Sequence, residues 1–123
     1  MKRKYDDLRT GHRLTNKKWA LANPEKARIY KARYIRKKNC EKRGITIAQF
    51  DEMLTQQNNR CSICSKEFVD MGGIGQVPVI DHCHTTGKVR GLLCHQCNVG
   101  VGYLKDSPDV LRKAAAYVER FAI

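Results

Sequence analysis

Two pairs of cysteines give the sequence its clearest chemical pattern. In each pair two residues separate the partners: Cys61, Cys64, Cys94 and Cys97. Thiolates spaced in this way can approach a metal from one side, and two pairs complete the tetrahedron that Zn²⁺ prefers. Because four thiolates leave no coordination position for water, we expect a structural zinc rather than a catalytic one. His95, inside the second pair, is an alternative zinc ligand that could replace one thiolate. Cys40 and Cys83 are interpreted as ordinary buried or free thiols.

A second group of residues could perform hydrolysis. Asp81 and His82 lie on an expected strand, and Asn98 directly follows the last zinc cysteine, so the zinc would bring Asn98 across the hairpin toward Asp81. Carboxylate and carboxamide oxygens suit Mg²⁺ or Mn²⁺, and magnesium in proteins keeps positions for water and phosphate. A neutral His82 imidazole beside that metal can take a proton from water. This chemistry is that of phosphodiester hydrolysis.

One geometric difficulty accompanies this interpretation. Adjacent residues of a regular strand point to opposite faces, so Asp81 and His82 cannot both face one metal on an ideal strand. Either the strand ends or bulges near Asp81, or the metal and the attacking water are flanked from two sides. A different interpretation makes both residues hydrogen-bonded supports of the zinc site, but it leaves Asn98 and the charge distribution unexplained.

The elements that must position these residues follow from caps and turns. Asn23, Pro24 and Glu25 are typical of a helix start, and Ser107-Pro108-Asp109 repeats the pattern. We expect helices at 24–43, 47–57, 94–105 and 108–121, strands at 77–84 and 89–93, and a flexible loop at 70–77. Gly44 is expected to end the first of these helices, and Thr46 is expected to cap the second, with Phe50 on its buried face. Residues 1–22 are expected to be loosely ordered when no partner is bound. The unit that carries the chemistry is then knuckle, hairpin and helix, at about 61–105.

The net charge of +12 lies entirely in the first 43 residues, which hold 16 Lys and Arg and four acids. A basic segment attached to a neutral body is typical of a nucleic-acid-binding protein, although a solubilising tail is the alternative. We therefore divide the chain into an arm at 1–43 that contacts DNA and an endonuclease domain at 44–123. The candidate phosphate contacts on the expected basic helix are Lys31, Arg33, Arg36, Lys37 and Lys38.

A longer block of sequence resembles a known family. Residues 81–98, DHCHTTGKVRGLLCHQCN, are similar to the phage recombination endonuclease VII family, a branch of the HNH or ββα-metal nucleases. The resemblance extends upstream through Gln57 and Arg60–Cys64 and covers about residues 44–105. It implies an α+β fold with a small zinc-stapled ββα core, preceded by the basic helical extension and followed by a C-terminal helix.

The resemblance also assigns roles to residues. It implies that Asp81 and Asn98 bind Mg²⁺ or Mn²⁺, that His82 is the general base, and that His84 contacts the scissile phosphate or supports the site. It implies that the four cysteines hold Zn²⁺. Lys88 and Arg90 become candidates for phosphate contacts. Some relatives place an acid one turn after the asparagine, where this chain has Val101, so we expect no third carboxylate ligand from that position.

The resulting hypothesis is a DNA endonuclease, with branched or junction DNA as one candidate substrate. A nicking or weakly site-selective nuclease of duplex DNA is an alternative, and a non-catalytic zinc module that binds DNA is an alternative of another class. Resolution of a junction would need two active sites, so a homodimer is an option. No stretch is apolar enough for a membrane span, and the N-terminus lacks a secretory pattern, so we expect a cytosolic protein of a phage or its host.

Overall fold

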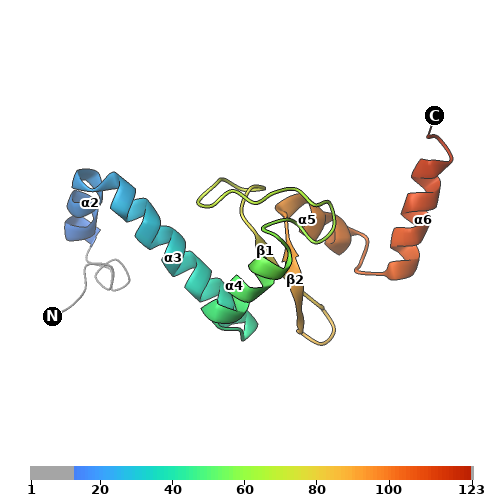
Figure 1. Ribbon diagram of the computed structural model, residues 1–123, viewed down its shortest axis with the longest axis horizontal. Helices are drawn as coiled ribbons and strands as arrows, with labels where there is room; N and C mark the ends of the chain where they lie inside the picture. The colour runs from blue at the N-terminus through green and yellow to red at the C-terminus, as the bar shows by residue number, and fades with distance from the viewer. Residues whose placement is uncertain (1–12, 123) are drawn as a thin grey trace. The chain divides into compact units, whose positions relative to one another are not determined.

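A computed structural model describes residues 13–122, and all structural statements below concern that range (Figure 1). The elements in chain order are α2 Arg13–Ala22, α3 Pro24–Arg43, α4 Ile47–Gln56, β1 Val79–His82, β2 Val89–Leu93, α5 His95–Tyr103 and α6 Pro108–Glu119. The chain separates into two compact units, with the boundary between Asn39 and Cys40. The division into a DNA-binding arm and an endonuclease domain is a functional prediction and stays one.

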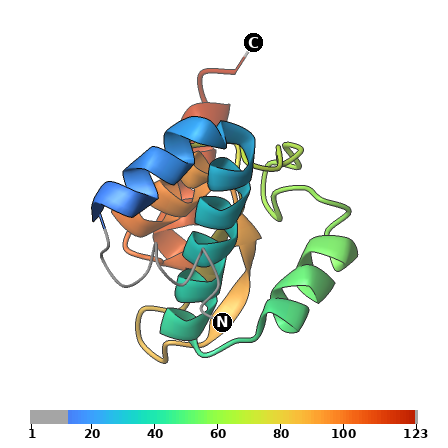
Figure 2. The same cartoon turned by 90° about the vertical axis from the view of Figure 1, so that its left-hand side faces the viewer.

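The N-terminal unit contains α2 and most of α3, which meet at Asn23 (Figure 2). The expected loose order of residues 1–22 is wrong for 13–22, which are helical, while residues 1–12 lie outside the described range. Trp19 stacks on Tyr30 with ring centroids 5.5 Å apart, and this contact joins the two helices. The Asn23 side chain donates to the Trp19 carbonyl at 3.0 Å, so it serves the end of α2 instead of capping α3 as expected.

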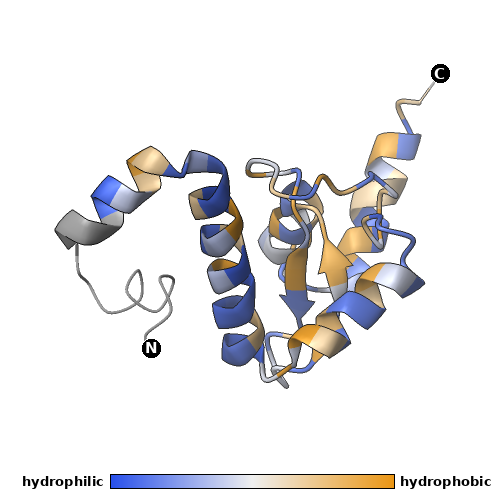
Figure 3. Ribbon diagram, turned by 60° about the vertical axis from the view of Figure 1, so that its left-hand side comes forward, coloured by the Kyte–Doolittle hydropathy of each residue, from blue (hydrophilic) through white to orange (hydrophobic). Residues whose placement is uncertain are grey.

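The basic helix α3 has the bounds that the sequence predicts. Figure 3 shows it as mainly hydrophilic with a narrow apolar stripe. Its last turn belongs to the second unit, where Cys40 is buried, and this confirms Cys40 as a buried thiol. Gly44, in the left-handed region at φ 72°, ends the helix, as a residue without a Cβ can do at little cost.

The second unit is built around a small core. Helix α4 begins at the predicted cap: the Thr46 hydroxyl accepts from the Gln49 backbone, and the Gln49 side chain accepts from Thr46 N–H. Phe50 on α4 is only 2% exposed, as expected. The buried apolar residues are Cys40, Phe50, Cys61, Phe68, Ile80, Leu92, Leu93 and Cys94. Within the described range, no helix is both long and apolar enough to cross a membrane.

Strands β1 and β2 form an antiparallel hairpin, and α5 packs against both of them (Figure 1). β2 has its predicted bounds, but β1 is shorter than the expected 77–84. Pro78 has no N–H to offer a ladder, and after His82 the chain turns, with Gly87 N–H donating to Cys83 carbonyl at 2.7 Å. Helix α5 ends two residues before the expected Lys105, because a tight turn follows Tyr103. Helix α6 starts at its predicted Ser107 cap.

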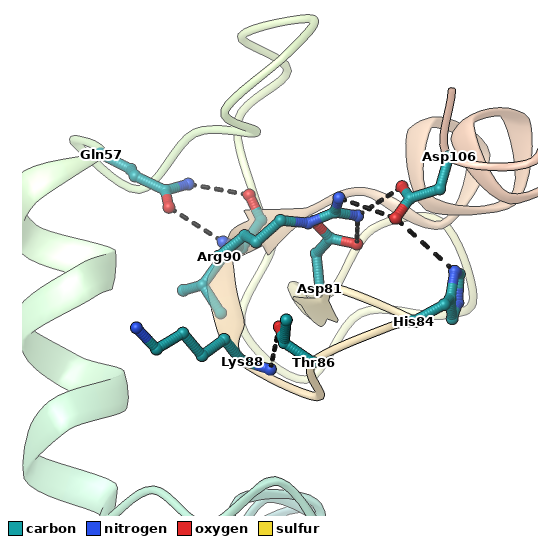
Figure 4. Close-up of polar contacts among 8 residues, drawn as sticks. Gln57, Asp81, His84, Thr86, Lys88, Arg90 and Asp106 are labelled. Carbon is teal, nitrogen blue, oxygen red and sulfur yellow. Dashed lines mark hydrogen bonds and ion pairs between the residues drawn. The ribbon is translucent and has the colours of Figure 1, made fainter. Parts of the chain in front are cut away.

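The outer edge of β2 is bound by a side chain of α4's C-cap residue. The Gln57 amide oxygen accepts from Leu92 N–H at 2.9 Å, and its nitrogen donates to the Leu92 carbonyl at 2.9 Å (Figure 4). The same nitrogen also donates to the Arg60 carbonyl at 2.8 Å. Ser62 N–H donates to the same Leu92 carbonyl at 3.2 Å. One amide therefore joins the helix, the first cysteine turn and the hairpin.

Candidate active site and cysteine cluster

The four cysteines predicted to bind zinc come together in the second unit. Their Sγ atoms all lie within 4.8 Å of one another, and this group could hold a metal ion. The Sγ atoms of Cys64 and Cys94 are 3.8 Å apart. Zn–S bonds of about 2.3 Å give a tetrahedron with S–S edges of about 3.8 Å. The donor set and the spacing of these cysteines therefore fit Zn²⁺.

Local backbone structure places the two cysteine turns. Cys61 N–H donates to the Lys66 carbonyl at 2.8 Å, and Ser65 N–H donates back to the Cys61 carbonyl at 3.0 Å. Ser65 adopts φ 63°, the left-handed conformation that reverses the chain after the first pair. Cys94 is the N-cap of α5, and its Sγ accepts from Cys97 N–H at 3.5 Å. The second pair thus forms the first turn of the helix.

The protonation of two of these thiols is perturbed in opposite directions. Burial raises the pKa of Cys61, but hydrogen bonds from the backbone of Cys94, Cys64 and Ile63 outweigh it and lower that pKa to about 6. Burial, together with the neighbouring thiols, raises the pKa of Cys97. Thiols this close oppose one another's ionisation, and a divalent cation removes that opposition when it binds them as thiolates.

Asp81 is the one buried charged residue in the described range, with 8% of its surface exposed. The Arg90 guanidinium neutralises it through two bonds, Nε to Oδ2 at 2.7 Å and Nη2 to Oδ1 at 3.0 Å. The same guanidinium donates from Nη2 and Nη1 to the two oxygens of Asp106, at 2.7 and 2.9 Å (Figure 4). The two carboxylates raise the pKa of Arg90, and the bond to Arg90 lowers the pKa of Asp106.

Two imidazoles lie next to this carboxylate pair. The rings of His82 and His84 meet edge to face, with centroids 4.9 Å apart. His84 Nδ1 lies 3.8 Å from Asp106 Oδ2, an ion-pair distance rather than a hydrogen bond. Burial lowers the pKa of His82, as does the positive charge of Arg43, and Asp81 opposes them. The environment of His82 therefore favours its neutral imidazole.

The hairpin contains an irregularity where the sequence alone posed a difficulty. Asp81 pairs with Gly91 and His82 pairs with Val89, so the register shifts between Asp81 and His82, and Arg90 is the extra residue. Such a bulge breaks the alternation of side-chain faces on the strand that carries the extra residue, here β2. The bulged strand is β2, and β1 itself ends at His82, one residue after Asp81, so whether Asp81 and His82 face one metal stays a prediction.

The second predicted oxygen ligand, Asn98, lies at the start of α5. Its N–H donates to the Cys94 carbonyl at 3.0 Å, so the second cysteine pair fixes its position along the helix that packs on the hairpin. Each Asp81 oxygen receives one bond from Arg90, and a carboxylate has about four acceptor sites, so both oxygens keep capacity for a further partner. A buried carboxylate and a carboxamide are hard donors that fit Mg²⁺ or Mn²⁺.

The basic residues predicted on the hairpin differ in their engagement. Lys88 is exposed on the turn. Arg90 uses four of the five N–H groups of its guanidinium on Asp81 and Asp106. Arg90 therefore has little capacity left for a phosphate, whereas Lys88 is open to one.

The sequence-based prediction assigns no role to two residues of this site, Asp106 and Gln57. Asp106 stands just before a helix start, and only the fold returns it to Arg90 and His84. Gln57 was recognised only as part of the resemblance, since nothing in its neighbourhood indicates that it binds Leu92 of β2. Cys83 and His95 lie outside the cysteine cluster, and Cys83 is a free thiol, as expected.

Fold and site together define a small α+β protein in which a two-stranded sheet adjoins four cysteines able to hold zinc. The chain belongs to the recombination endonuclease VII family, whose sequence profile matches residues 36–120. This match confirms the resemblance carried by residues 81–98.

Curated relatives come from mycobacterial phages. The chain is 35% identical over 78 residues to the "Gene 59 protein" of Mycobacterium phage D29, which covers 63% of this chain and 45% of that protein. It is 34% identical over 76 residues to the protein of the same name from Mycobacterium phage L5, which covers 61% of this chain and 44% of the relative. The match thus spans less than half the length of each relative. No solved structure matches the chain.

Proposed function

We propose that this protein is a metal-dependent DNA endonuclease that hydrolyses phosphodiester bonds through an HNH site on a ββα-metal core. The observation that carries the proposal is the buried Asp81 carboxylate beside His82, on a bulged hairpin in a chain of the recombination endonuclease VII family. Burying a carboxylate is costly unless it is paired, and Arg90 supplies that pairing for Asp81. A buried, paired carboxylate next to a neutral imidazole is a combination found at catalytic sites, and it supports a catalytic role here.

In the proposed site each residue has a separate role. Asp81 and Asn98 would hold Mg²⁺ or Mn²⁺, which when bound supplies positive charge for the phosphoryl oxygens and the leaving oxygen. His82 takes the proton from the attacking water through its neutral imidazole. His84, exposed and next to His82, contacts the scissile phosphate or supports the site. The four cysteines hold a structural Zn²⁺ that fixes the first cysteine turn, the hairpin and α5 together.

The basic helix α3 is the proposed DNA-binding arm. Lys31, Arg33, Lys37 and Lys38 are exposed and Arg36 is half-buried. On the exposed surface of the same helix, Arg28 pairs with Glu25 at 3.7 Å. Contacts from such residues go to phosphates, which position the protein on DNA without reading its sequence. We therefore propose low sequence selectivity.

We expect DNA affinity to fall steeply with salt, because each neutralised phosphate releases condensed counterions. A slope of log K against log salt of about −3 to −5 corresponds to the five α3 residues engaging most of their phosphates. Replacing Arg33 and Lys37 together with Gln should reduce the slope by about 2, as measured by fluorescence anisotropy on duplex DNA. A matched pair on α6, Arg112→Gln with Lys113→Gln, serves as control. An unchanged slope in the α3 variant would show that this helix is not the arm.

The function is tested by incubating the purified chain with supercoiled plasmid in Mg²⁺, in Mn²⁺ and in EDTA. We expect nicked or linear products only with the divalent ion. The reason is that the ion would stabilise the negative charge that develops on the phosphoryl and leaving oxygens during hydrolysis. Side-by-side incubation with a four-way junction, a nicked duplex and a linear duplex decides among the candidate substrates. Absence of cleavage on every substrate, with salt-dependent binding retained, would establish the non-catalytic zinc module instead.

Dimerisation is proposed as the condition for double-strand cleavage or junction resolution, since two strands need two sites. Light scattering of the protein with and without junction DNA measures this directly. A monomer that produces only nicked circles would favour the nicking nuclease of duplex DNA.

A further inference from the structure

Asp106 occupies a central position in the site although no ligand pattern includes it. Its two oxygens receive Arg90 Nη2 and Nη1 at 2.7 and 2.9 Å, and Oδ2 lies 3.8 Å from His84 Nδ1. The adjacent Nε–Nη2 edge of the same guanidinium holds both oxygens of Asp81. Figure 4 shows Arg90 between the two carboxylates, with His84 beside Asp106. A carboxylate that forms two hydrogen bonds with an arginine holds the guanidinium in one orientation. The other groups bonded to that guanidinium are then held as well.

The backbone around Asp106 supports a specific role. Lys105 and Asp106 both adopt φ 58°, in the left-handed region that residues with a Cβ rarely occupy. The turn is closed by Asp106 N–H donating to the Val101 carbonyl at 2.9 Å, and the next residue, Ser107, already caps α6. Two consecutive unfavourable residues persist only where the surroundings determine them, and here they bring a carboxylate from beyond α5 to β2.

Because Arg90 is the bulge residue opposite the step from Asp81 to His82, its position affects both. A guanidinium that bonds one lone pair of each Asp81 oxygen determines which lone pairs stay open and where they point. Arg90 can serve this purpose only if its guanidinium is held in place, and Asp106 holds it through the adjacent Nη1–Nη2 edge.

We propose that Asp106 is a positioning residue of the nuclease site: it fixes Arg90 against Asp81 and thereby aims the Asp81 carboxylate at the divalent metal. The inference rests on the proposed function, but the quantity that it predicts is the affinity of the chain for the divalent metal, which can be measured without DNA. Asp106 occupies no position in the ligand set assigned to Asp81 and Asn98, and it acts through Arg90.

The experiment compares Asp106→Ala and Asp106→Asn with a matched control, Asp109→Asn. Asp109 is an exposed carboxylate near Asp106 in sequence, paired with Lys113 at 3.3 Å on α6. Mn²⁺ binding to the full zinc-loaded chain is titrated by electron paramagnetic resonance of the free ion. Loss of a residue that orients a metal ligand typically costs about 10–100-fold in metal affinity or activity. We expect a weakening of that size for Asp106→Ala, a smaller one for Asp106→Asn, and none for the control.

A second readout separates positioning from simple destabilisation. The Mg²⁺ concentration for half-maximal plasmid cleavage should rise in the Asp106 variants by the same factor as the Mn²⁺ dissociation constant, while DNA affinity in Ca²⁺ stays within about twofold of the unaltered chain. Asp106→Glu, which restores the charge, should recover part of the lost affinity. In an Arg90→Lys background, Asp106→Ala should have little further effect, because the two residues act as one unit.

The outcomes are distinguishable. If the unaltered chain cleaves no DNA but Asp106→Ala weakens Mn²⁺ binding, the nuclease assignment fails and the positioning role stands. If the chain cleaves DNA and both Asp106 variants retain normal Mn²⁺ affinity and Mg²⁺ dependence, the positioning role is overturned. If Asp106→Ala fails to retain zinc and a folded circular dichroism spectrum, Asp106→Asn and Asp106→Glu decide on the same two readouts.

Discussion

Replacing His82 with alanine is expected to reduce DNA cleavage by about 10²- to 10⁴-fold, the range that general-base catalysis typically contributes. His82 follows the buried Asp81 on β1, opposite the Arg90 bulge of β2, and burial together with the charge of Arg43 lowers its pKa and favours its neutral form. The imidazole is half-buried rather than part of the core, so its removal leaves no large cavity. The rate of plasmid nicking at saturating Mg²⁺ is the measurement, with the rate in EDTA subtracted.

The matched control is His95→Ala. The His95 imidazole is exposed on α5 and lies outside the cysteine cluster, so cleavage should persist in that variant. Zinc content and DNA affinity should be unchanged in His82→Ala. Normal nicking by the His82 variant would show that His82 is not the general base and that another group accepts the proton from water.

Removal of the zinc proposed for the four-cysteine cluster is expected to unfold the unit that begins at Cys40. Structural zinc contributes on the order of 10 kcal/mol or more in small zinc domains. A whole domain is stable by about 5–15 kcal/mol, so the metal can account for most of the net stability. Three of the eight buried apolar residues are cysteines, and two of these, Cys61 and Cys94, belong to the cluster. The apolar core without its metal is therefore small.

Cys97→Ser is the variant that tests this dependence, and Cys83→Ser is its control, because Cys83 lies outside the cluster. Elemental analysis should give one zinc per unaltered chain and a loss in the Cys97 variant. Thermal unfolding followed by circular dichroism should lose its cooperative transition in the Cys97 variant alone. A cooperative transition at an unchanged temperature after complete zinc removal would contradict the structural role.

Much of this fold is predictable because short-range rules determine it. The Thr46 and Ser107 caps, the Gly44 helix end and the β2 strand follow from local residue types, and the structure has them where the sequence predicts them. The four-cysteine cluster is also predictable, because its spacing is a property of metal geometry.

The parts that could not be predicted depend on contacts between distant residues. Residues 13–22 form a helix whose Trp19 stacks on Tyr30 of the next helix. The composition of residues 13–22 gives no indication of this contact. The return of Asp106 to Arg90 depends on the turn after α5, where Lys105 and Asp106 adopt a left-handed conformation that residues with a Cβ disfavour. The roles of Asp81, His82, His84 and Asn98 remain predictions whose placement in the fold is consistent with the proposed chemistry.

The amide of Gln57 has a consequence for how copies of this chain can associate. An unpaired strand edge offers a row of donors and acceptors to any other extended chain, and proteins with open edges tend to grow into larger sheets. Here the outward N–H and carbonyl of Leu92 are already bound by one side chain. At Leu92 the β2 edge is therefore already occupied, and a second copy could add a strand there only by displacing the Gln57 amide.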